Sequence, residues 1–150
     1  MTGEAQEPTS GRLDGRAHIF PVRVYYEDTD FSGVVYHANY LRFMERGRSE
    51  FLRLAGAGHD GMLAASAPLV WVVRRMTTDF IRPARMDDAL TVRTSVLDLK
   101  GARMRLDQGI FRAADLLVKA EVEVCTISLD GRPRRVPDST RQKLDLFLEN

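Results

Sequence analysis

The sequence lacks the features that mark exported, membrane-spanning and nucleic-acid-binding proteins. Its only cysteine, Cys125, cannot form an internal disulfide, and a lone cysteine in a strand pattern is usually a small buried apolar residue. No apolar run approaches the roughly 20 residues that a membrane span needs, and residues 1–17 lack the apolar core of a signal peptide. The formal net charge of +1 favours neither nucleic acid nor membrane binding. These absences predict a cytoplasmic protein with no nucleic-acid partner and no membrane insertion.

The length and composition predict one globular domain. A chain of 150 residues can bury about 68–70% of its extended surface. Its apolar content of 44% and charged content of 29% are ordinary for such a domain. Residues 1–17 are rich in Gly, Glu, Arg and Ser, so we expect a disordered leader there. The domain is then expected to span residues 18–150, with structure beginning near His18.

Hydrophobic periodicity predicts one long helix after a first strand at 19–26. Apolar residues recur at spacings of three and four from Tyr40 to Ala55, which marks one face of a helix that Gly56 ends. Gly47 lies on this apolar face, so we expect close approach to another backbone. The opposite, solvent-facing side is expected to hold Arg42, Glu45, Arg46, Arg48 and Ser49.

The second half of the chain predicts antiparallel strands. Strands are expected at 69–81, 90–99, 103–112 and 118–129, because most of these runs alternate apolar and polar residues. In the third, Gln108 shares the apolar face. Asp138 or Ser139 is expected to cap a last helix. The sum is an α+β domain in which an antiparallel sheet of about five strands wraps around one long central helix.

The segment before the long helix carries the most chemistry. The first four N–H groups of a helix lack internal partners, and the macrodipole adds roughly half a positive charge there. A thioester carbonyl at this point would have its developing oxyanion stabilised, and a thiolate of pKa about 8.5 leaves without much proton assistance. Asp30 is brought back toward this point by a Ser32–Gly33 turn. It is expected to act either as a nucleophile that forms a mixed anhydride or as a general base on water.

The neighbouring polar residues have simpler interpretations. Glu27 and Asp28 are expected to be solvated or turn-forming, and Glu45 and Glu50 to pair with arginines on the helix. Asp28, Asp30 and Ser32 also resemble the opening of a calcium loop. Asn39 occupies its twelfth position, where a bidentate Glu is needed, so no metal is expected. His37 acts either through its imidazole or only through its backbone N–H. His18 and His59 are expected to have surface or turn roles.

The same residues carry a family resemblance. The runs Tyr25–Asp30 and Gly33–Tyr40, with Glu45–Arg46 and Phe80–Asp88, resemble the signature of the hotdog-fold acyl-CoA thioesterases. The resemblance is greatest to the 4-hydroxybenzoyl-CoA thioesterase-like branch that is encoded with bacterial Tol–Pal envelope genes. It implies a hotdog fold, acyl-CoA hydrolysis without a cofactor, and a homodimer that often pairs into a homotetramer. It also implies that Asp30 is the catalytic carboxylate and that a backbone N–H near His37 polarises the carbonyl, at a dimer interface.

The substrate contacts expected on this basis form two groups. The turn and helix-start residues are Gly33, Val34, Val35, Tyr36 and Asn39. Coenzyme A brings phosphates, so cationic side chains are expected at the rim; we assign this role to Lys100 and Arg103, with Arg74, Arg75, Arg82 and Arg85 as further candidates. Acyl carrier protein is an alternative carrier of the acyl group.

Two other functions remain open from the sequence. A hotdog hydratase or dehydratase would use His37 with Glu45 or Glu50 to move a proton next to the thioester. A non-catalytic module that binds acyl carriers or envelope complexes would keep the fold without turnover.

Overall fold

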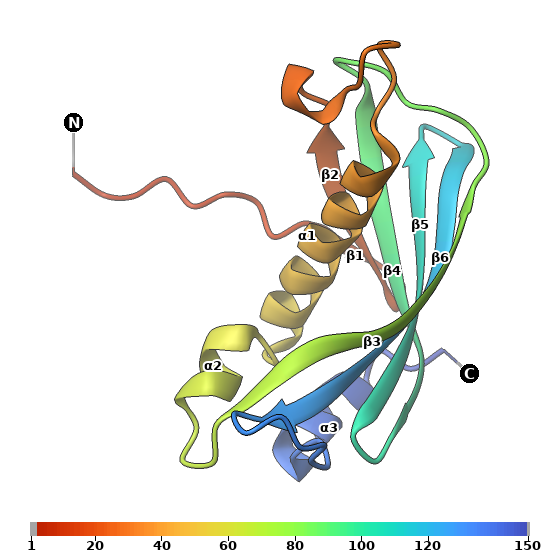
Figure 1. Ribbon diagram of the computed structural model, residues 1–150. Coiled ribbons are helices and arrows are strands. Elements are labelled where there is room, and N and C mark those ends of the chain that lie inside the picture. Colours follow the sequence, from red (N-terminus) through yellow and green to blue (C-terminus); the bar gives the residue numbers. More distant parts are fainter. Residues whose placement is uncertain (1–2, 150) are drawn as a thin grey trace.

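The computed structural model describes residues 3–149 and shows an antiparallel sheet wrapped around one long helix (Figure 1). The strand order is β1-β2-β4-β5-β6-β3. The strands are β1 Arg12–Asp14, β2 Ala17–Arg23, β3 Leu69–Phe80, β4 Ala89–Lys100, β5 Arg103–Arg112 and β6 Asp115–Ser128. The helices are the 3-10 helix η1 Tyr26–Asp28, α1 His37–Ala55, α2 His59–Ala64 and α3 Asp138–Asp145. The predicted α+β class, with one central helix, is confirmed.

The sheet has six strands in the described residues, where the sequence predicted about five. The extra strand is β1, in which Arg12 lies opposite Ile19 and Asp14 opposite Ala17 of β2. All residues of β1 are exposed, so its pairing rests on main-chain hydrogen bonds and leaves no hydrophobic pattern in the sequence. Regular structure therefore begins at Arg12 rather than near His18. Disorder of the leader stays a prediction.

His18 is fully buried in β2, so its expected surface or turn role is wrong. Its Nε2 lies 2.6 Å from the carbonyl oxygen of Ser10, and its ring packs against that of Phe51 with centroids 6.0 Å apart. Burial lowers the pKa of His18. The physical reason is that the chain before β1 folds back over the end of β2 and covers the imidazole.

Helix α1 begins at His37, three residues before the first apolar residue of the pattern, and ends at Ala55, as the periodicity predicted. Gly56 follows in the left-handed conformation with φ of 80°, and its N–H donates to the carbonyl of Arg53. A Cβ atom at Gly47 would lie 2.6 Å from Cγ1 of Val92 in β4, so the expected close approach is to the sheet. The predicted solvent exposure of Arg48 is wrong, because its side chain is buried on the inner face of the helix.

Helix α3 has Pro137 at its N-cap and no capping side-chain hydrogen bond, so the prediction of a cap by Asp138 or Ser139 is wrong. The helix begins at Asp138, so Asp138 and Ser139 lie in its first turn, past the capping position. Cys125 is buried in β6, as its strand pattern predicted. Within residues 3–149, no helix combines the length and the apolar character that a membrane crossing requires.

Candidate functional site

A tight turn holds Asp30 shortly before the start of α1. The Gly33 N–H donates to the Asp30 carbonyl at 3.0 Å, and the Asp30 N–H donates to the Val34 carbonyl at 2.8 Å. Gly33 has a φ of 83°, in the left-handed region that glycine adopts without steric cost. The predicted turn is therefore confirmed, and glycine at position 33 is what permits it.

The carboxylate of Asp30 is exposed and held by one side only. Its Oδ1 accepts hydrogen bonds from the Ser32 hydroxyl at 2.5 Å and from the Ser32 N–H at 2.8 Å. The hydroxyl bond is the main cause, and the N–H bond the second, of an Asp30 pKa below the ordinary value. Its Oδ2 accepts no hydrogen bond of normal geometry within residues 3–149, while the backbone N–H groups of Val34 and of Asp30 itself add smaller contributions to the lowered pKa. Asp30 is thus ionised at neutral pH with one oxygen free to react.

Main-chain hydrogen bonds attach this turn to the helix and to the segment before β4. The Val35 N–H donates to Ala84 at 2.8 Å, and the Ala84 N–H donates to the Tyr40 hydroxyl at 2.8 Å. Burial raises the pKa of Tyr40, and the negative charges of Asp88 and Asp30 add to this effect. The turn and the first turn of α1 are thus joined through Ala84.

Asp28 builds the loop rather than acting in it. It is buried, its Oδ2 accepts from the Tyr25 N–H at 2.8 Å, and its carbonyl accepts from the Tyr36 N–H and the Asn39 side-chain amide, both at 2.9 Å. These bonds confirm the turn-forming interpretation of Asp28. They also give Asn39 a structural role, since its amide fixes the start of α1 to η1.

The start of α1 offers free hydrogen-bond donors. Tyr36 occupies the N-cap without a capping side-chain hydrogen bond, and the Asn39 N–H donates to the Tyr36 carbonyl at 2.8 Å. The N–H groups of His37 and Ala38 donate to no acceptor in the described part of the chain. Two backbone donors at the positive end of a 19-residue helix are thus available to an oxygen of a ligand.

The ring of His37 is exposed and faces aromatic neighbours. Its centroid lies 4.5 Å from that of Tyr36 and 6.1 Å from that of Phe80, in an edge-on arrangement. It lines a cavity of about 260 Å³ together with Val35, Tyr40, Phe80, Ile81, Arg82 and Pro83. Asp30 lines a second cavity with Tyr26, Thr29, Phe31, Gly33 and Met86. Within residues 3–149 the two side chains share no hydrogen bond.

The structure brings together the predicted turn and helix-start residues but not the predicted phosphate contacts. Lys100 and Arg103 form the β4–β5 hairpin, at the bottom of the view in Figure 1, whereas the turn of Asp30 is at the top. The 12 residues of β4 separate them by roughly 35 Å. Arg103 instead lies 3.7 Å from Glu123. Two arginines lie beside the turn. The backbone of Arg85 forms an isolated β-bridge with that of Val34, and Arg82 lines the His37 cavity.

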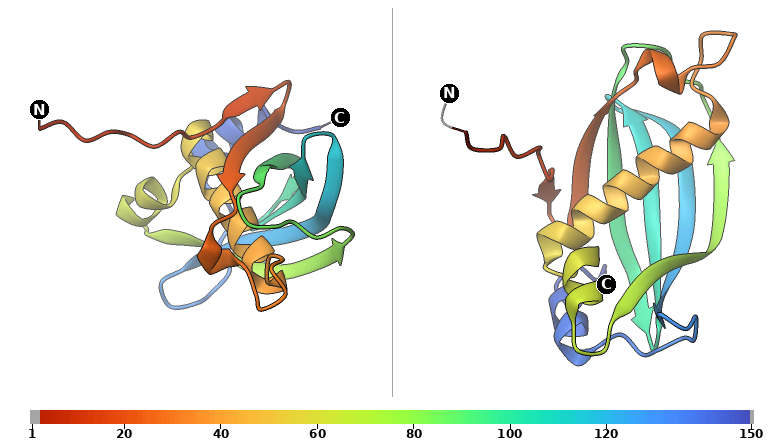
Figure 2. Two further views of the ribbon diagram at one scale, coloured as in Figure 1. Left: turned by 90° about the horizontal axis from the view of Figure 1, so that it is seen from above. Right: turned by 60° about the vertical axis from the view of Figure 1, so that its left-hand side comes forward.

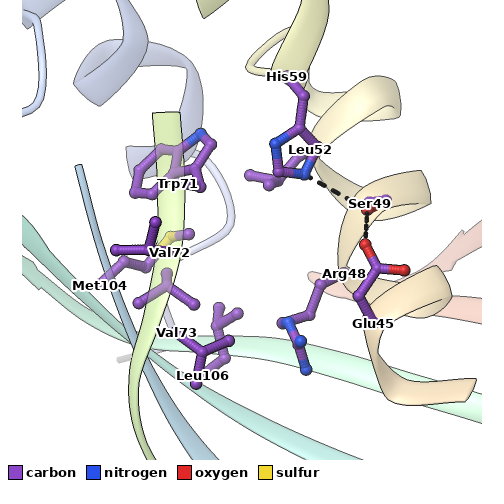
Figure 3. Close-up of a pocket in the computed structure, with 11 residues that line it drawn as sticks. Glu45, Arg48, Ser49, Leu52, His59, Trp71, Val72, Val73, Met104 and Leu106 are labelled. Carbon is purple, nitrogen blue, oxygen red and sulfur yellow. Dashed lines mark hydrogen bonds between the residues drawn. The ribbon is translucent and has the colours of Figure 1, made fainter. Parts of the chain in front are cut away.

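A third cavity lies between α1 and β3 (Figure 3). Its volume is about 90 Å³, and its polar lining residues are Glu45, Arg48, Ser49 and His59. The Ser49 hydroxyl donates to Glu45 at 2.8 Å and lies 3.4 Å from the His59 ring. The expected pairing of Glu45 with an arginine is therefore wrong, because Ser49 one turn along reaches it first, while Glu50 pairs with Arg53 at 2.5 Å as predicted.

A buried polar contact in this region was not predicted. The Arg48 guanidinium donates to Oε1 of Gln108 at 2.9 Å, and the Gln108 amide donates to the Met44 carbonyl and to the Thr94 hydroxyl. The available signal was Gln108 itself, a polar residue on the apolar face of a strand, which must find buried partners.

Comparisons with known proteins show the family to which the chain belongs. A family model described as the Thioesterase-like superfamily matches residues 24–144. The acyl-CoA thioester hydrolase YbgC of Escherichia coli is 43% identical over 122 residues, which cover 80% of this chain and 90% of that protein. The acyl-CoA thioesterase YbgC of Haemophilus influenzae is 44% identical over 110 residues, which cover 73% and 80%.

Among solved structures, a probable thioesterase from Bartonella henselae superposes with a TM-score of 0.78 at 48% identity, covering 81% of this chain and 99% of that chain. The family match and the relatives both extend over most of the sequence. The chain therefore belongs to the Thioesterase-like superfamily and has the hotdog fold that its sequence resembled.

Proposed function

We propose that the protein is an acyl-CoA thioesterase that hydrolyses an acyl-CoA to the free acid and CoA, with Asp30 as its catalytic carboxylate. The single observation that carries the proposal is the turn: an ionised Asp30 with a free Oδ2 shortly before a helix start with free N–H groups at His37 and Ala38. Hydrolysis of acyl-CoA is the activity named for the relatives from E. coli and H. influenzae.

The reaction follows from this geometry. The thioester carbonyl oxygen accepts hydrogen bonds from the N–H groups at the start of α1. These bonds stabilise the oxyanion as the carbonyl carbon becomes tetrahedral. In the general-base route, Asp30 takes a proton from water while the hydroxide adds to that carbon. The carbon–sulfur bond then breaks, the thiolate of CoA leaves with the electron pair and takes up the proton, and the acid is released. In the nucleophilic route, Oδ2 adds to the carbonyl carbon and the thiolate of CoA leaves with the electron pair of the carbon–sulfur bond and takes up a proton. Water then hydrolyses the mixed anhydride, which releases the acid and restores the Asp30 carboxylate.

The substrate lies along the same residues. Gly33, Val34, Val35 and Tyr36 form the wall between the carboxylate and the helix start, and Asn39 holds that wall in place. The imidazole of His37 borders the substrate cavity and serves as a packing surface, whereas the backbone N–H of His37 is the catalytic contact. Within one protomer the phosphate-binding role assigned to Lys100 and Arg103 passes to Arg82 and Arg85, which lie beside the turn.

A screen over CoA thioesters tests the function. The native protein is incubated with saturated, branched and aromatic acyl-CoA compounds and a thiol reagent that reports free CoA. Release of CoA supports the thioesterase. Binding of the same compounds without release would instead favour a non-catalytic acyl-carrier or envelope-complex module. Repeating the screen with acyl groups on acyl carrier protein shows which carrier is preferred.

The hydratase alternative has no support in the geometry. Glu45 and Glu50 lie roughly 12 Å and 20 Å further along α1 than His37, since each residue advances the helix by about 1.5 Å. Glu45 is bonded to Ser49 and Glu50 to Arg53. The histidine and carboxylate that would share a proton are therefore apart.

The active form is proposed to be a homodimer paired through β3. This strand spans 12 residues at the end of the sheet and pairs only with β6 in the described residues (Figure 2, right). Val73 and Phe80 in β3, and Ile81 directly after it, are about half exposed. A long edge strand with exposed apolar side chains readily pairs with another chain. In such a dimer, the partner would cover the exposed cavities beside Asp30 and His37.

We expect light scattering after gel filtration to give twice the 17.0 kDa mass of the chain, or four times if dimers pair. Diluting the protein should lower its specific activity in step with dissociation, because each site is completed by the partner. A monomeric mass with full activity would contradict the proposal.

The pH dependence of Ser32→Ala tests the role of the Asp30 carboxylate. The Ser32 hydroxyl is the main cause of the lowered Asp30 pKa. A base or nucleophile works only when ionised, so activity is lost as pH falls through that pKa. Removing the hydroxyl raises the pKa toward its ordinary value of about 3.9. We therefore expect kcat/KM of the variant to begin its acid-side decline at a higher pH than that of the native protein.

The control for this experiment is Ser66→Ala, which changes an exposed serine in the loop before β3. Circular dichroism at each pH separates loss of activity from unfolding. If the acid limbs of Ser32→Ala and the native protein coincide, Asp30 is not the group whose ionisation controls turnover.

A further inference from the structure

Arg48 is a buried cation whose guanidinium has no direct carboxylate contact in the described part of the chain, although the negative charge of Glu45 acts on it. Its side chain extends from α1 into the cavity between the helix and β3, toward Leu106 and Val73 (Figure 3). It is 8% exposed, and its burial lowers its pKa, yet a guanidinium stays protonated in proteins. Arg48 forms no ion pair within residues 3–149. The charge of Glu45 offsets this burial only in part, and a buried charge without a hydrogen-bonded counter-ion is costly, so its retention calls for a partner.

The protein itself satisfies only part of the guanidinium. One nitrogen, Nη1, donates to Oε1 of Gln108, and the remaining N–H groups of the guanidinium donate to no acceptor in the described part of the chain. The carboxylate of Glu45 lies on the same helix but is turned toward Ser49, whose hydroxyl it binds (Figure 3). Gln108 fixes the Arg48 side chain, because its own amide is anchored to Met44 and Thr94. The fork of Arg48 is thus positioned and still able to bind two oxygens.

The other walls of the cavity are apolar. They are Leu52, Trp71, Val72, Val73, Met104, Leu106 and Val124. Such a lining accepts a hydrocarbon chain and excludes water, which strengthens a hydrogen bond between an anion and Arg48. The combination fits a ligand with an apolar stem and an anionic end.

The Arg48 cavity and the His37 cavity are two separate cavities that border the same two elements. Both the His37 cavity and the Arg48 cavity lie between α1 and β3, the first against Phe80 and the second against Trp71 and Val73. Along the helix, Arg48 is roughly 16 Å beyond His37, and helical side chains lean back toward the N-terminus, which shortens the remaining span. An acyl chain with its thioester at the helix start can therefore reach Arg48 with its far end.

We infer that this cavity is the distal subsite for the acyl group and that Arg48 selects acyl chains that end in a carboxylate, that is, the CoA half-thioesters of dicarboxylic acids. This inference rests on the proposed thioesterase function and names its substrate class. Arg48 is a specificity-determining residue in it, since it binds the end of the substrate remote from the reacting carbonyl.

The test compares pairs of CoA thioesters with the same number of carbons, one ending in a methyl group and one in a carboxylate, over chains of about five to ten carbons. At the best-fitting length we expect kcat/KM to be at least about 10-fold higher for the carboxylate, the factor that one hydrogen bond between charged groups supplies. A third series ends in a hydroxyl group and tests whether the charge or only an oxygen acceptor is recognised.

Variants then assign the preference to the guanidinium. Arg48→Met should lower the ratio of the two kcat/KM values at least about 10-fold, and Arg48→Lys, which keeps the charge but not the fork, should give an intermediate ratio. Arg46→Met is the matched control, because it removes an exposed arginine from the same helix. Its ratio should equal that of the native protein.

The measurements on the native protein decide the matter even where Arg48→Met fails to fold. Equal rates for the two series, faster turnover of methyl-ended chains at every length, or a preference for the hydroxyl series over the carboxylate series would overturn the inference and leave the thioesterase function intact. A carboxylate preference unchanged in Arg48→Lys and in folded Arg48→Met would also overturn it. Absence of turnover with every thioester would overturn both.

Discussion

Asp30→Asn should fold as the native protein does and bind CoA compounds, but lose at least about 100-fold in hydrolysis rate. The amide keeps the oxygen that accepts from Ser32, so the turn is retained. What is lost is the negative charge, and with it the capacity of the free oxygen to take a proton or to attack a carbonyl. The factor of about 100 is the low end of what a positioned acid–base group contributes. Release of CoA from a good acyl-CoA substrate measures it directly.

The matched control is Asp145→Asn, which removes one exposed carboxylate from the end of α3. Its rate should equal that of the native protein, so any loss in Asp30→Asn is not a consequence of changed net charge. Thermal unfolding of both variants checks that the fold is retained. Turnover near the native rate in Asp30→Asn would show that another group activates the nucleophile and would remove the basis of the proposed mechanism.

Gly47→Leu is expected to cause the largest loss of stability. At this position even a Cβ would lie 2.6 Å from Cγ1 of Val92, which is fully buried and β-branched and so has no free rotamer to move into. The helix must then separate from β4 or the sheet must bend. Overpacking of this kind costs about 3 kcal/mol, which in a domain of this size lowers Tm by about 6–12 °C.

Gly61→Leu provides the comparison. Gly61 is also helical, but within the described residues no atom lies within 4 Å of the position that a Cβ would take there. The substitution should be neutral or raise Tm slightly, because leucine favours a helix more than glycine does. Calorimetry at one protein concentration compares the two variants. Equal Tm values would mean that α1 does not depend on close contact with β4 at Gly47.

The long elements of the fold could be predicted because each has a local signal. The apolar spacing from Tyr40 onward and the Gly56 stop gave the end of α1, and alternation gave β5 at its observed bounds, Arg103–Arg112. Strand β1 could not be predicted because its exposed side chains form no pattern. The burial of His18 depends on residues before β1 that cover it, and no rule of local periodicity carries that information.

The site divides in the same way. The turn at Asp30 was predictable because Ser32 and Gly33 encode it within a few residues, and the structure confirms that turn. The separation of Lys100 and Arg103 from the Asp30 turn depends on which end of β4 lies beside that turn. This is set by the arrangement of the strands in the sheet, which local sequence patterns do not give. Arg48 was assigned to the solvent side together with the other polar residues of the helix, and the position of Gln108 across the core shows why it is buried.

The hydrogen bonds that join Val35, Ala84 and Tyr40 make segment 81–88 part of the framework of the proposed active site, although it is distant in sequence from Asp30. Inserting or deleting a residue there would displace the carboxylate with every reactive group still present. The β4–β5 hairpin at Gly101 lies at the far end of the sheet and has open space around it. It is therefore the place to attach a fluorophore, an affinity handle or a fused protein while sparing the chemistry.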